Sequence, residues 1–294
     1  MQVIITMAGK GSRFSESGYT EPKPVVNMAG KPAIEYLVDA FPKEWNLIFA
    51  VGAHYKGSIV EKVLRNIRPE AQIIFSEHTE RGPIDTVKAA LPILNSNDPV
   101  MVSYCDYSLV WDPNDFLRVI ADYDAAVVSY LGFHPTYFGP NSYCHLQVDG
   151  NRVTKLQEKV LFTDDIEKEV TSVGLYYFKN LATLVSALNE QEVQDLKYKT
   201  EFYTSLAIQA LMNSQPEVKV LNYIVEHMVQ TGTPSDTERF EFWHSVLIQN
   251  QEPGEFKFQH IIKEKQPTSF TPALFELEKV YWQKTFSELL DQKK

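Results

Sequence analysis

The sequence has few cysteines and no excess of positive charge, and each shortage excludes a class of protein. Only two of its 294 residues are cysteines, Cys105 and Cys144, which is too few for a disulfide framework. Its 28 lysines and arginines are outnumbered by 38 aspartates and glutamates. The resulting formal net charge of −10 argues against nucleic acid or an anionic membrane surface as the main partner. We therefore expect neither a nucleic-acid nor a membrane partner.

Long apolar runs and common catalytic motifs are missing as well. No window approaches the length of a transmembrane segment, and the N-terminal residues show no succession of basic, apolar and cleavage segments. The seven histidines lack H-x-x-x-H spacing and the cysteines lack C-x-x-C, so the sequence indicates neither a zinc site nor a Ser-His-Asp set. The simplest location for such a chain is the cytoplasm.

What the first 124 residues contain is a regular alternation of short apolar segments and amphipathic segments. The apolar segments cover residues 3–6, 46–51, 71–75 and 99–103, and helical patterns follow from Pro32, Ser58, Gly82 and Asp112. Strands alternating with helices at this spacing form β-α-β units. The sequence therefore predicts an α/β fold with a doubly wound, mostly parallel, mixed sheet of the Rossmann-like kind.

The regular alternation of strands and helices does not continue after residue 124. We expect strands at 125–131 and 172–178, a hairpin of 144–148 and 152–157 around Asp149-Gly150, and a strand at 218–225. Helices are expected at 180–188, 201–212, 236–248 and 272–290. We divide the chain into a domain of residues 1–240, with halves 1–124 and 125–240, and a helical C-terminal extension of residues 241–294.

A glycine-rich segment follows the first strand and is the strongest local signal. Glycines allow the backbone to approach phosphate oxygens and to turn N–H groups toward them. Arg13 can bind two oxygens in a fork, and Lys23 can add a point charge. Neither the P-loop nor the dinucleotide pattern matches, because Ile4 and Phe14 stand where each needs a glycine. The segment is either an ordinary strand-to-helix turn or a triphosphate cradle, and the two basic residues favour the cradle.

Asp106 lies just beyond the apolar run 99–103, at the predicted carboxyl end of a strand. Ligands of doubly wound sheets bind beyond these ends, and the segment 9–13 occupies another of them. An aspartate in this place is commonly a turn or helix cap. Beside a phosphate cradle, a ligand of Mg²⁺ is the better interpretation, since Mg²⁺ binds one or two carboxylates together with phosphates and waters.

These motifs together resemble a known family. A-G-x-G-S-R from Ala8, P-K-P from Pro22 and G-K-P from Gly30 are similar to the signature of the nucleotidyltransferases that make sugar nucleotides and related activated phosphates. The resemblance covers about residues 1–240. It implies a nucleotidyltransferase core, an NTP and a phosphorylated small-molecule acceptor as partners, and Mg²⁺ as cofactor.

The resemblance also implies roles for single residues. Glu158 and Lys159 follow the hairpin as the family's acceptor-binding pair does, with the glutamate on hydroxyls and the lysine on the acceptor phosphate. Gly174 matches the glycine that leaves room for the acceptor. Arg13 and Lys23 would be catalytic, Asp106 would bind the metal, and the nucleotide would be bound by Ala8, Gly9, Lys10, Gly11, Ser12 and Gly82.

One position departs from the family pattern. The late motif D-x-G-T-P is Gln230-Thr231-Gly232-Thr233-Pro234 in this chain, so a glutamine stands where the family completes its metal site with an aspartate. A glutamine oxygen can still coordinate a cation, but without a charge. We therefore assign Gln230 to metal or water, and Glu226, four residues earlier, could point the same way along a strand. The other interpretation is a non-catalytic nucleotide-binding subunit.

The function implied is transfer of a nucleoside monophosphate from an NTP to a phosphorylated acceptor, with release of pyrophosphate. A sugar 1-phosphate is the first acceptor to consider, and CTP, dTTP or UTP are preferred to purine nucleotides. The alternative within this class is a cytidylyltransferase acting on a non-sugar phosphate or phosphonate. A glycosyltransferase of similar fold would need a D-x-D motif, which Asp106-Tyr107-Ser108 lacks. The resemblance suggests synthesis of capsule or surface-polysaccharide precursors, and a homo-oligomer is left open.

Overall fold

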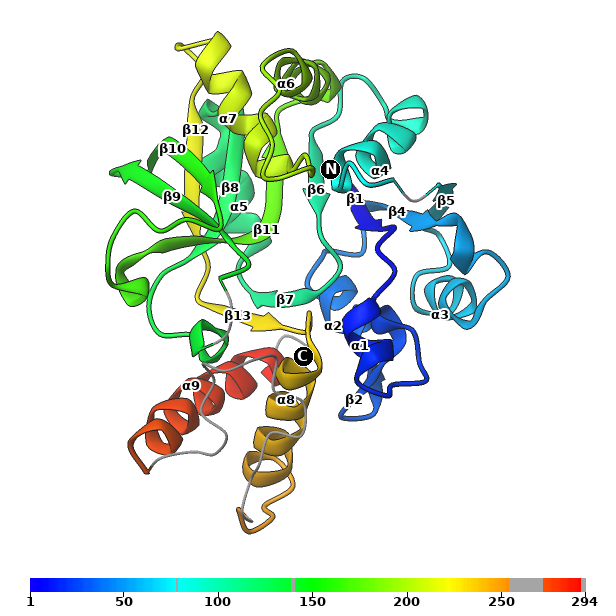
Figure 1. Ribbon diagram of the computed structural model, residues 1–294, viewed down its shortest axis with the longest axis vertical. Helices are drawn as coiled ribbons and strands as arrows, with labels where there is room; N and C mark the ends of the chain where they lie inside the picture. The colour runs from blue at the N-terminus through cyan, green and yellow to red at the C-terminus, as the bar shows by residue number, and fades with distance from the viewer. Residues whose placement is uncertain (78, 139–140, 254–271, 292–294) are drawn as a thin grey trace.

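A nine-stranded mixed sheet runs through the computed structural model, which describes residues 1–77, 79–138, 141–253 and 272–291 (Figure 1). The strands lie in the order β5-β4-β1-β6-β11-β8-β12-β10-β9. They comprise β1 (Gln2–Met7), β4 (Asn46–Gly52), β5 (Gln72–Ser76), β6 (Val100–Ser103), β8 (Ala125–Tyr130), β9 (Cys144–Asp149), β10 (Arg152–Glu158), β11 (Val170–Phe178) and β12 (Val220–Ile224). Two short ribbons pair β7 (Tyr107–Val110) with β13 (His227–Gln230), and β2 (Asn27–Met28) with β3 (Lys31–Pro32).

Helices cover both faces of the sheet because its strands are apolar on both sides. In β1, Val3 and Ile5 pack into one cluster and Ile4 packs into the other. The first cluster includes side chains of α2 (Ala33–Asp39), α3 (Ile59–Ile67), α5 (Pro113–Val119), α8 (Pro234–Leu247) and α9 (Pro272–Asp291). The second includes side chains of α4 (Pro83–Ala90), α6 (Leu181–Val193) and α7 (Thr204–Ser214). The short α1 (Ser12–Glu16) follows the glycine-rich segment.

The predicted doubly wound α/β fold is confirmed, with one refinement of strand direction. Strands β5, β4, β1 and β6 are parallel, as β-α-β units require. Beyond β6 the sheet is mixed: β11 runs antiparallel to both β6 and β8, whereas β12 is parallel to β8. The hairpin around Asp149-Gly150 is also present, as β9 and β10.

Three predicted helices differ in extent from the expectation, and one of them, expected over 180–188, continues to Val193 as α6. The helix expected over 201–212 begins only at Thr204, because the segment before it is held in an extended form. There Tyr198 bridges to Glu201, and the N–H of Phe202 donates to the carbonyl of Arg81 at 2.8 Å. The helix expected over 236–248 begins at Pro234, because Thr233 and Asp236 form a reciprocal capping box.

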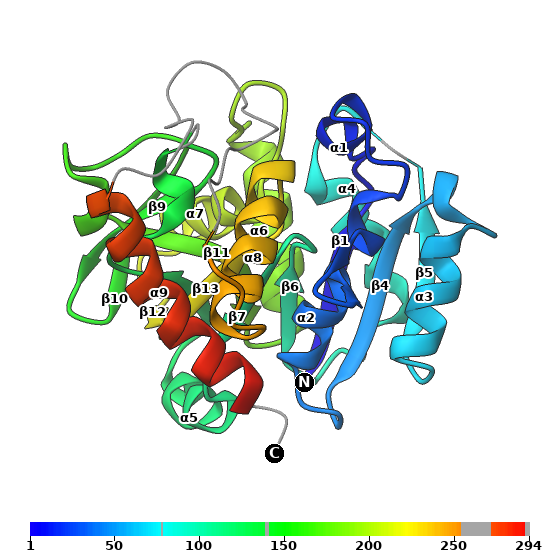
Figure 2. The same ribbon diagram turned by 90° about the horizontal axis from the view of Figure 1, so that it is seen from below.

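The predicted division at 124 and 240 remains a prediction. In the structure, one sheet continues from the first half into the second, and α8 runs across residue 240. The helices α8 and α9 contact each other, and α9 also contacts β7 and β13 (Figures 1 and 2). Within the described ranges, none of the helices is both long and apolar enough to cross a bilayer.

Candidate functional site

The glycine-rich segment after β1 packs against the Pro-Lys-Pro segment. Gly11 has φ +64°, and a Cβ at this position would lie 3.1 Å from the Cβ of Lys23. A side chain here would be strained by its backbone conformation as well as crowded. Lys23 begins a short 3-10 helix, Lys23–Val25, after Pro22. The glycine therefore lets the two basic segments approach each other at the carboxyl end of β1.

Lys23 and Asp106 form an ion pair at this end of the sheet. The Lys23 Nζ lies 2.8 Å from Oδ2 of Asp106, and the two side chains are 20% and 34% exposed. Burial disfavours the charged forms of both side chains, but the charge attraction and the hydrogen bond between them together outweigh this effect. The pKa of Lys23 is consequently raised and the pKa of Asp106 is lowered, with the charge of Arg13 also lowering the pKa of Asp106. Both groups are charged at neutral pH.

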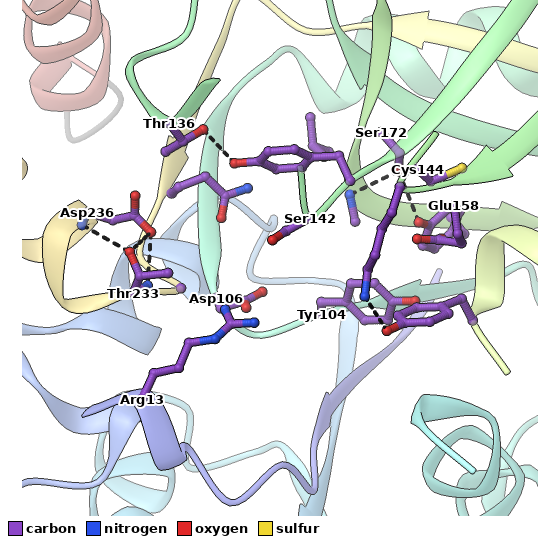
Figure 3. A pocket seen from close by; sticks show the side chains of 18 of the residues that line it. Arg13, Tyr104, Asp106, Thr136, Ser142, Cys144, Glu158, Ser172, Thr233 and Asp236 are labelled. Atoms are coloured by element: carbon purple, nitrogen blue, oxygen red, sulfur yellow. Dashed lines mark hydrogen bonds between the residues drawn. The ribbon is translucent and has the colours of Figure 1, made fainter. Parts of the chain in front are cut away.

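Two adjoining cavities meet at this ion pair. One, of about 280 Å³, is lined by the glycine-rich segment, Lys23 and the residues around Gly82. The other, of about 300 Å³, is lined by residues of β11 and by Glu158 and Lys159 at the end of β10. Figure 3 shows this cavity, with Glu158 on its wall. Three residues line both cavities, namely Tyr104, Asp106 and Tyr203. Each cavity thus has its own lysine, and Asp106 lies between them.

The larger cavity holds a buried acid and a caged cation. Glu158 is 5% exposed and accepts a hydrogen bond from the Ser205 hydroxyl. Burial raises the pKa of Glu158 to about 7, although Ser205 and Lys159 oppose the shift. The Nζ of Lys159 donates to the Tyr203 hydroxyl at 2.7 Å and lies over the rings of Tyr203 and Tyr198. The cavity can therefore offer both a hydrogen-bond acceptor for hydroxyls and a cation for an anion.

Oxygen atoms of Asp106 and Gln230 converge beside Gly232. A Cβ at Gly232 would lie 3.1 Å from Asp106 Oδ2 and 3.6 Å from Gln230 Oε1. This space suits a small cation with oxygen ligands, as Mg²⁺ prefers. Across the described residues, no group of three or more His, Cys, Asp or Glu side chains could hold a metal ion.

The expectation that Glu226 points with Gln230 is wrong. Glu226 lies in the turn between β12 and β13 and lines a separate surface cavity with Trp111 and Tyr223. The strand β13 begins only at His227, so the alternation that would align residues 226 and 230 does not extend back to Glu226.

Most of the predicted site residues lie at the two cavities. Ala8, Gly9, Gly11, Lys23, Gly82 and Asp106 line the smaller one, and Arg13, Glu158, Lys159, Gly174, Gln230 and Asp106 line the larger one. Arg13 thus faces the larger cavity, toward Asp106, rather than the cavity of the glycine-rich segment (Figure 3). Lys10 and Ser12 are exposed and line neither cavity. Their binding roles, like those of the other residues, remain predictions.

Sequence reasoning did not single out several residues of the larger cavity. Tyr104, Tyr203 and Asp236 line it, and none of them was assigned a role in the sequence. For Asp236 a signal exists, because Thr233-x-x-Asp236 is a capping-box pattern before a helix. The two tyrosines carry no such signal, since they reach the cavity through tertiary packing.

The space beside Gly174 is taken by a tyrosine ring. Gly174 has φ +94°, and a Cβ there would lie 3.0 Å from Cδ2 of Tyr104. We expect Gly174→Ala to lower the free energy of unfolding by about 2–4 kcal/mol, since backbone strain and overpacking add. Urea denaturation followed by circular dichroism measures this change.

Gly150→Ala is the matched control for that variant. Gly150 also has a positive φ, +57°, but no atom lies within 4 Å of its Cβ position. It carries backbone strain alone, which costs about 1–2 kcal/mol. Equal losses in the two variants would contradict a close contact between residue 174 and Tyr104.

The fold and these cavities define the class of protein: an α/β protein with a glycine-rich, basic segment at the carboxyl end of its first strand. Residues 3–156 match the model of the MobA-like NTP transferase domain. This match covers more than half of the chain, and the chain belongs to this family.

Known proteins similar to this chain agree with the family. The bifunctional protein GlmU of Methanococcus maripaludis (strain C5) is 28% identical over 181 residues, which are 61% of this chain and 40% of that protein. The chain thus spans about two-fifths of that relative's length. A nucleoside-diphosphate-sugar pyrophosphorylase from Vibrio cholerae RC9 superposes with a TM-score of 0.66 at 19% identity, covering 81% of this chain and 99% of that one. The inositol-1-phosphate CTP transferase from T. maritima gives 0.62 at 15% identity, covering 80% and 90%.

Proposed function

We propose that the protein transfers a nucleoside monophosphate from an NTP to a phosphorylated acceptor and releases pyrophosphate. The observation that supports this most directly is the pair of adjoining cavities that share Asp106. Lys23 lies on the side of the glycine-rich segment, and Lys159 lies on the other side. A triphosphate in the first cavity and a phosphate monoester in the second would bring their phosphates together between the two lysines.

The chemistry needs little from the protein beyond charge and position. An oxygen of the acceptor phosphate attacks the α-phosphorus, the bond from that phosphorus to the bridging oxygen breaks, and pyrophosphate leaves with the electron pair. An ionised phosphate needs no general base to attack. Lys23 stabilises the charge that develops on the transferred and leaving oxygens, and Arg13 neutralises charge from the acceptor side. Glu158 accepts hydrogen bonds from acceptor hydroxyls, and Lys159 holds the acceptor phosphate.

We further propose Mg²⁺ as the cofactor, held by Asp106 and the Gln230 side-chain oxygen. Two protein oxygens and the space beside Gly232 fit an ion that takes its other ligands from phosphates and waters. When bound, Mg²⁺ acts as a Lewis acid on phosphate oxygens. The Asp106 carboxylate already forms an ion pair with the Lys23 ammonium. With Mg²⁺ bound, this one carboxylate would therefore contact two cations.

For the substrates, we propose CTP, dTTP or UTP and a sugar 1-phosphate. The structural neighbour named an inositol-1-phosphate CTP transferase supports the second candidate, a cytidylyltransferase for a non-sugar phosphate. The proposal extends to precursors of capsule or surface polysaccharides and to a cytoplasmic location. A non-catalytic nucleotide-binding subunit is the competing proposal, favoured only by the uncharged Gln230 in the metal position.

Pyrophosphate release tests the proposal. The purified protein is incubated with Mg²⁺ and each of CTP, dTTP, UTP, ATP and GTP, crossed with sugar 1-phosphates, a polyol phosphate, choline phosphate and a phosphonate. Release that depends on both an NTP and an acceptor supports the reaction and names its substrates. NTP binding without release for any pair would favour the non-catalytic subunit. Gln230→Asp then tests the metal role, because unchanged metal dependence and turnover would count against it.

The pKa of Glu158 predicts a pH dependence of acceptor binding. A carboxylate accepts hydrogen bonds from hydroxyls at both oxygens, whereas a protonated carboxyl loses part of this capacity. Because burial raises the pKa of Glu158 to about 7, the group becomes protonated as the pH falls through neutrality. We expect the acceptor KM to rise by up to about tenfold between pH 8 and pH 6, since one unit below the pKa leaves about a tenth of the carboxylate ionised.

The control for this dependence is Glu158→Gln. The acceptor phosphate also titrates, with a second pKa of about 6, and this titration persists in the variant. The difference between the two KM profiles therefore belongs to Glu158. Parallel profiles in the wild type and the variant would show that Glu158 does not bind the acceptor as a carboxylate.

A further inference from the structure

The segment 198–203 contributes to both cavities, since Glu201 lines the smaller one and Tyr203 lines both, and it is fixed to the wall of the smaller one. The N–H of Phe202 donates to the carbonyl of Arg81 at 2.8 Å, and Tyr198 bridges to Glu201. At Gly82, a Cβ would lie 3.0 Å from the Cβ of Glu201, so the two backbones are close together. Glu201 lines the smaller cavity as a result.

From Glu201, a chain of hydrogen bonds leads into the larger cavity. The Tyr203 hydroxyl donates to the Glu201 carboxylate and accepts from Lys159 Nζ at 2.7 Å. A tyrosine hydroxyl has a single proton, so the bond to Glu201 fixes its direction and leaves oxygen lone pairs for the ammonium. The ammonium has three N–H donors, and Tyr203 takes one of them. The others remain for an anion in the cavity.

The backbone of Lys159 is fixed as well. Its φ is +59°, a left-handed conformation that is unfavourable for a lysine, and its N–H donates to the carbonyl of Tyr143 at 2.7 Å. Residues held in such a conformation cluster at binding and catalytic sites. With both ends of the side chain held, the position of the charge depends on the Tyr203 hydroxyl.

We propose that Glu201 is a positioning residue that, through Tyr203, aims the Lys159 ammonium at the phosphate of the acceptor. This inference rests on the proposed function, in which Lys159 binds that phosphate. Glu201 itself lines the smaller cavity, which the proposed function assigns to the nucleotide. It would therefore influence acceptor binding from outside the acceptor cavity. A flexible lysine held in one direction loses less conformational entropy when the anion binds.

The negative charge of Glu201 stabilises the Lys159 ammonium, in addition to the hydrogen bond that Glu201 accepts from Tyr203. Burial lowers the pKa of Lys159, whereas the carboxylates of Glu158 and Glu201 raise it. The other charged groups that act on this ammonium are Arg13 and Lys199, and both lower its pKa. Loss of the Glu201 charge therefore shifts the deprotonation of Lys159 to lower pH.

Calorimetric titration with inorganic phosphate tests this positioning without any need for turnover. The difference between the wild type and Lys159→Ala defines the binding that depends on Lys159. We expect Glu201→Gln and Tyr203→Phe each to weaken this binding about tenfold, the effect of one hydrogen bond to a charged group. In Glu201→Gln, the alkaline limit of phosphate binding also moves to lower pH.

Tyr198→Phe is the matched control, because Tyr198 also contacts Lys159 with its ring but lines neither cavity. It removes a hydroxyl from the same pair of rings, and we expect unchanged phosphate binding. In the Lys159→Ala background, Tyr203→Phe and Glu201→Gln should have no further effect. Thermal unfolding confirms that each variant is folded.

Two results would overturn the inference. One is wild-type phosphate binding in both Glu201→Gln and Tyr203→Phe. The other is a loss of phosphate binding in these two variants that is equally large in the Lys159→Ala background, because such a loss indicates a general structural role of Glu201 and Tyr203. Absence of pyrophosphate release from the whole substrate panel would instead overturn the proposed function, and the phosphate titration distinguishes the two failures.

Discussion

Replacing Lys23 with methionine is expected to lower kcat by about 10²–10³-fold, the usual loss when one preorganised electrostatic contact to developing charge is removed. Lys23 is the basic residue that lines the smaller cavity and pairs with Asp106 at the junction with the larger one. Methionine keeps much of the apolar stem but removes the charge. The variant also leaves Asp106 without its ion-pair partner, so that the pKa of this buried carboxyl rises. The measurement is the initial rate of pyrophosphate release with the substrate pair found in the panel.

Lys31→Met is the matched control for this variant. Lys31 has a side chain 19% exposed, close to the 20% of Lys23, and it also forms ion pairs, with Glu35 and Asp39. It lines neither cavity. We expect its kcat to match that of the wild type. Equal kcat values in Lys23→Met and the wild type would contradict the proposed role of Lys23 in stabilising the transition state. Equal losses of kcat in Lys23→Met and Lys31→Met would indicate a general effect on the fold.

The alternation of apolar and amphipathic segments predicted much of the fold, because each β-α-β unit is a local pattern. The four parallel strands β5, β4, β1 and β6 all come from the first 103 residues, where this pattern is clearest. The sequence predicts that helix α7 begins at residue 201, because local propensity does not reveal the hydrogen bond from Phe202 to Arg81. A tertiary contact overrides the local preference there.

The place where the two cavities meet, at Asp106, could be predicted from the topology of the sheet. Carboxyl ends of neighbouring parallel strands lie at one edge of a sheet, and this places the glycine-rich segment beside Asp106. The same rule says nothing about Tyr203 or Glu201. Tyr203 contacts Lys159 and also bonds to Glu201, which joins the loop before α7 to the end of β10. No periodicity links these two segments in the sequence.

The C-terminal helix α9 is predicted from the sequence as a helix, but its place in the fold is not. In the structure its apolar side chains enter the core on the first face of the sheet. Tyr281 is buried and donates through its hydroxyl to the carbonyl of Met228 in β13. Since β13 ends at Gln230, α9 supports the strand that leads to the proposed metal position. An amphipathic pattern shows that a helix has a buried face, but not which surface covers that face.

The strongest test of this support is Glu278→Ala, which we expect to lower the free energy of unfolding by about 3–5 kcal/mol, the cost of breaking a buried ion pair. Glu278 in α9 is 0% exposed, and Arg239 in α8 is 1% exposed. The Arg239 Nε lies 3.0 Å from Oε1, and Trp243 Nε1 donates to Oε2 at 3.0 Å. Alanine would remove the acceptor of both donors and leave a cavity. Urea denaturation measures the change.

Two further variants separate charge from packing in this contact. Lys168→Ala removes an ion pair between exposed residues, Lys168 and Asp165, and we expect little change in stability. The double variant Arg239→Met with Glu278→Met replaces the buried pair with apolar side chains of similar length. It should recover most of the stability lost in Glu278→Ala, because a buried ion pair costs desolvation that an apolar pair does not. If Glu278→Ala unfolds at the same urea concentration as the wild type, α9 is not anchored through Arg239. If the double variant is no more stable than Glu278→Ala, the hydrogen bonds of this pair, rather than its burial, hold α9 against α8.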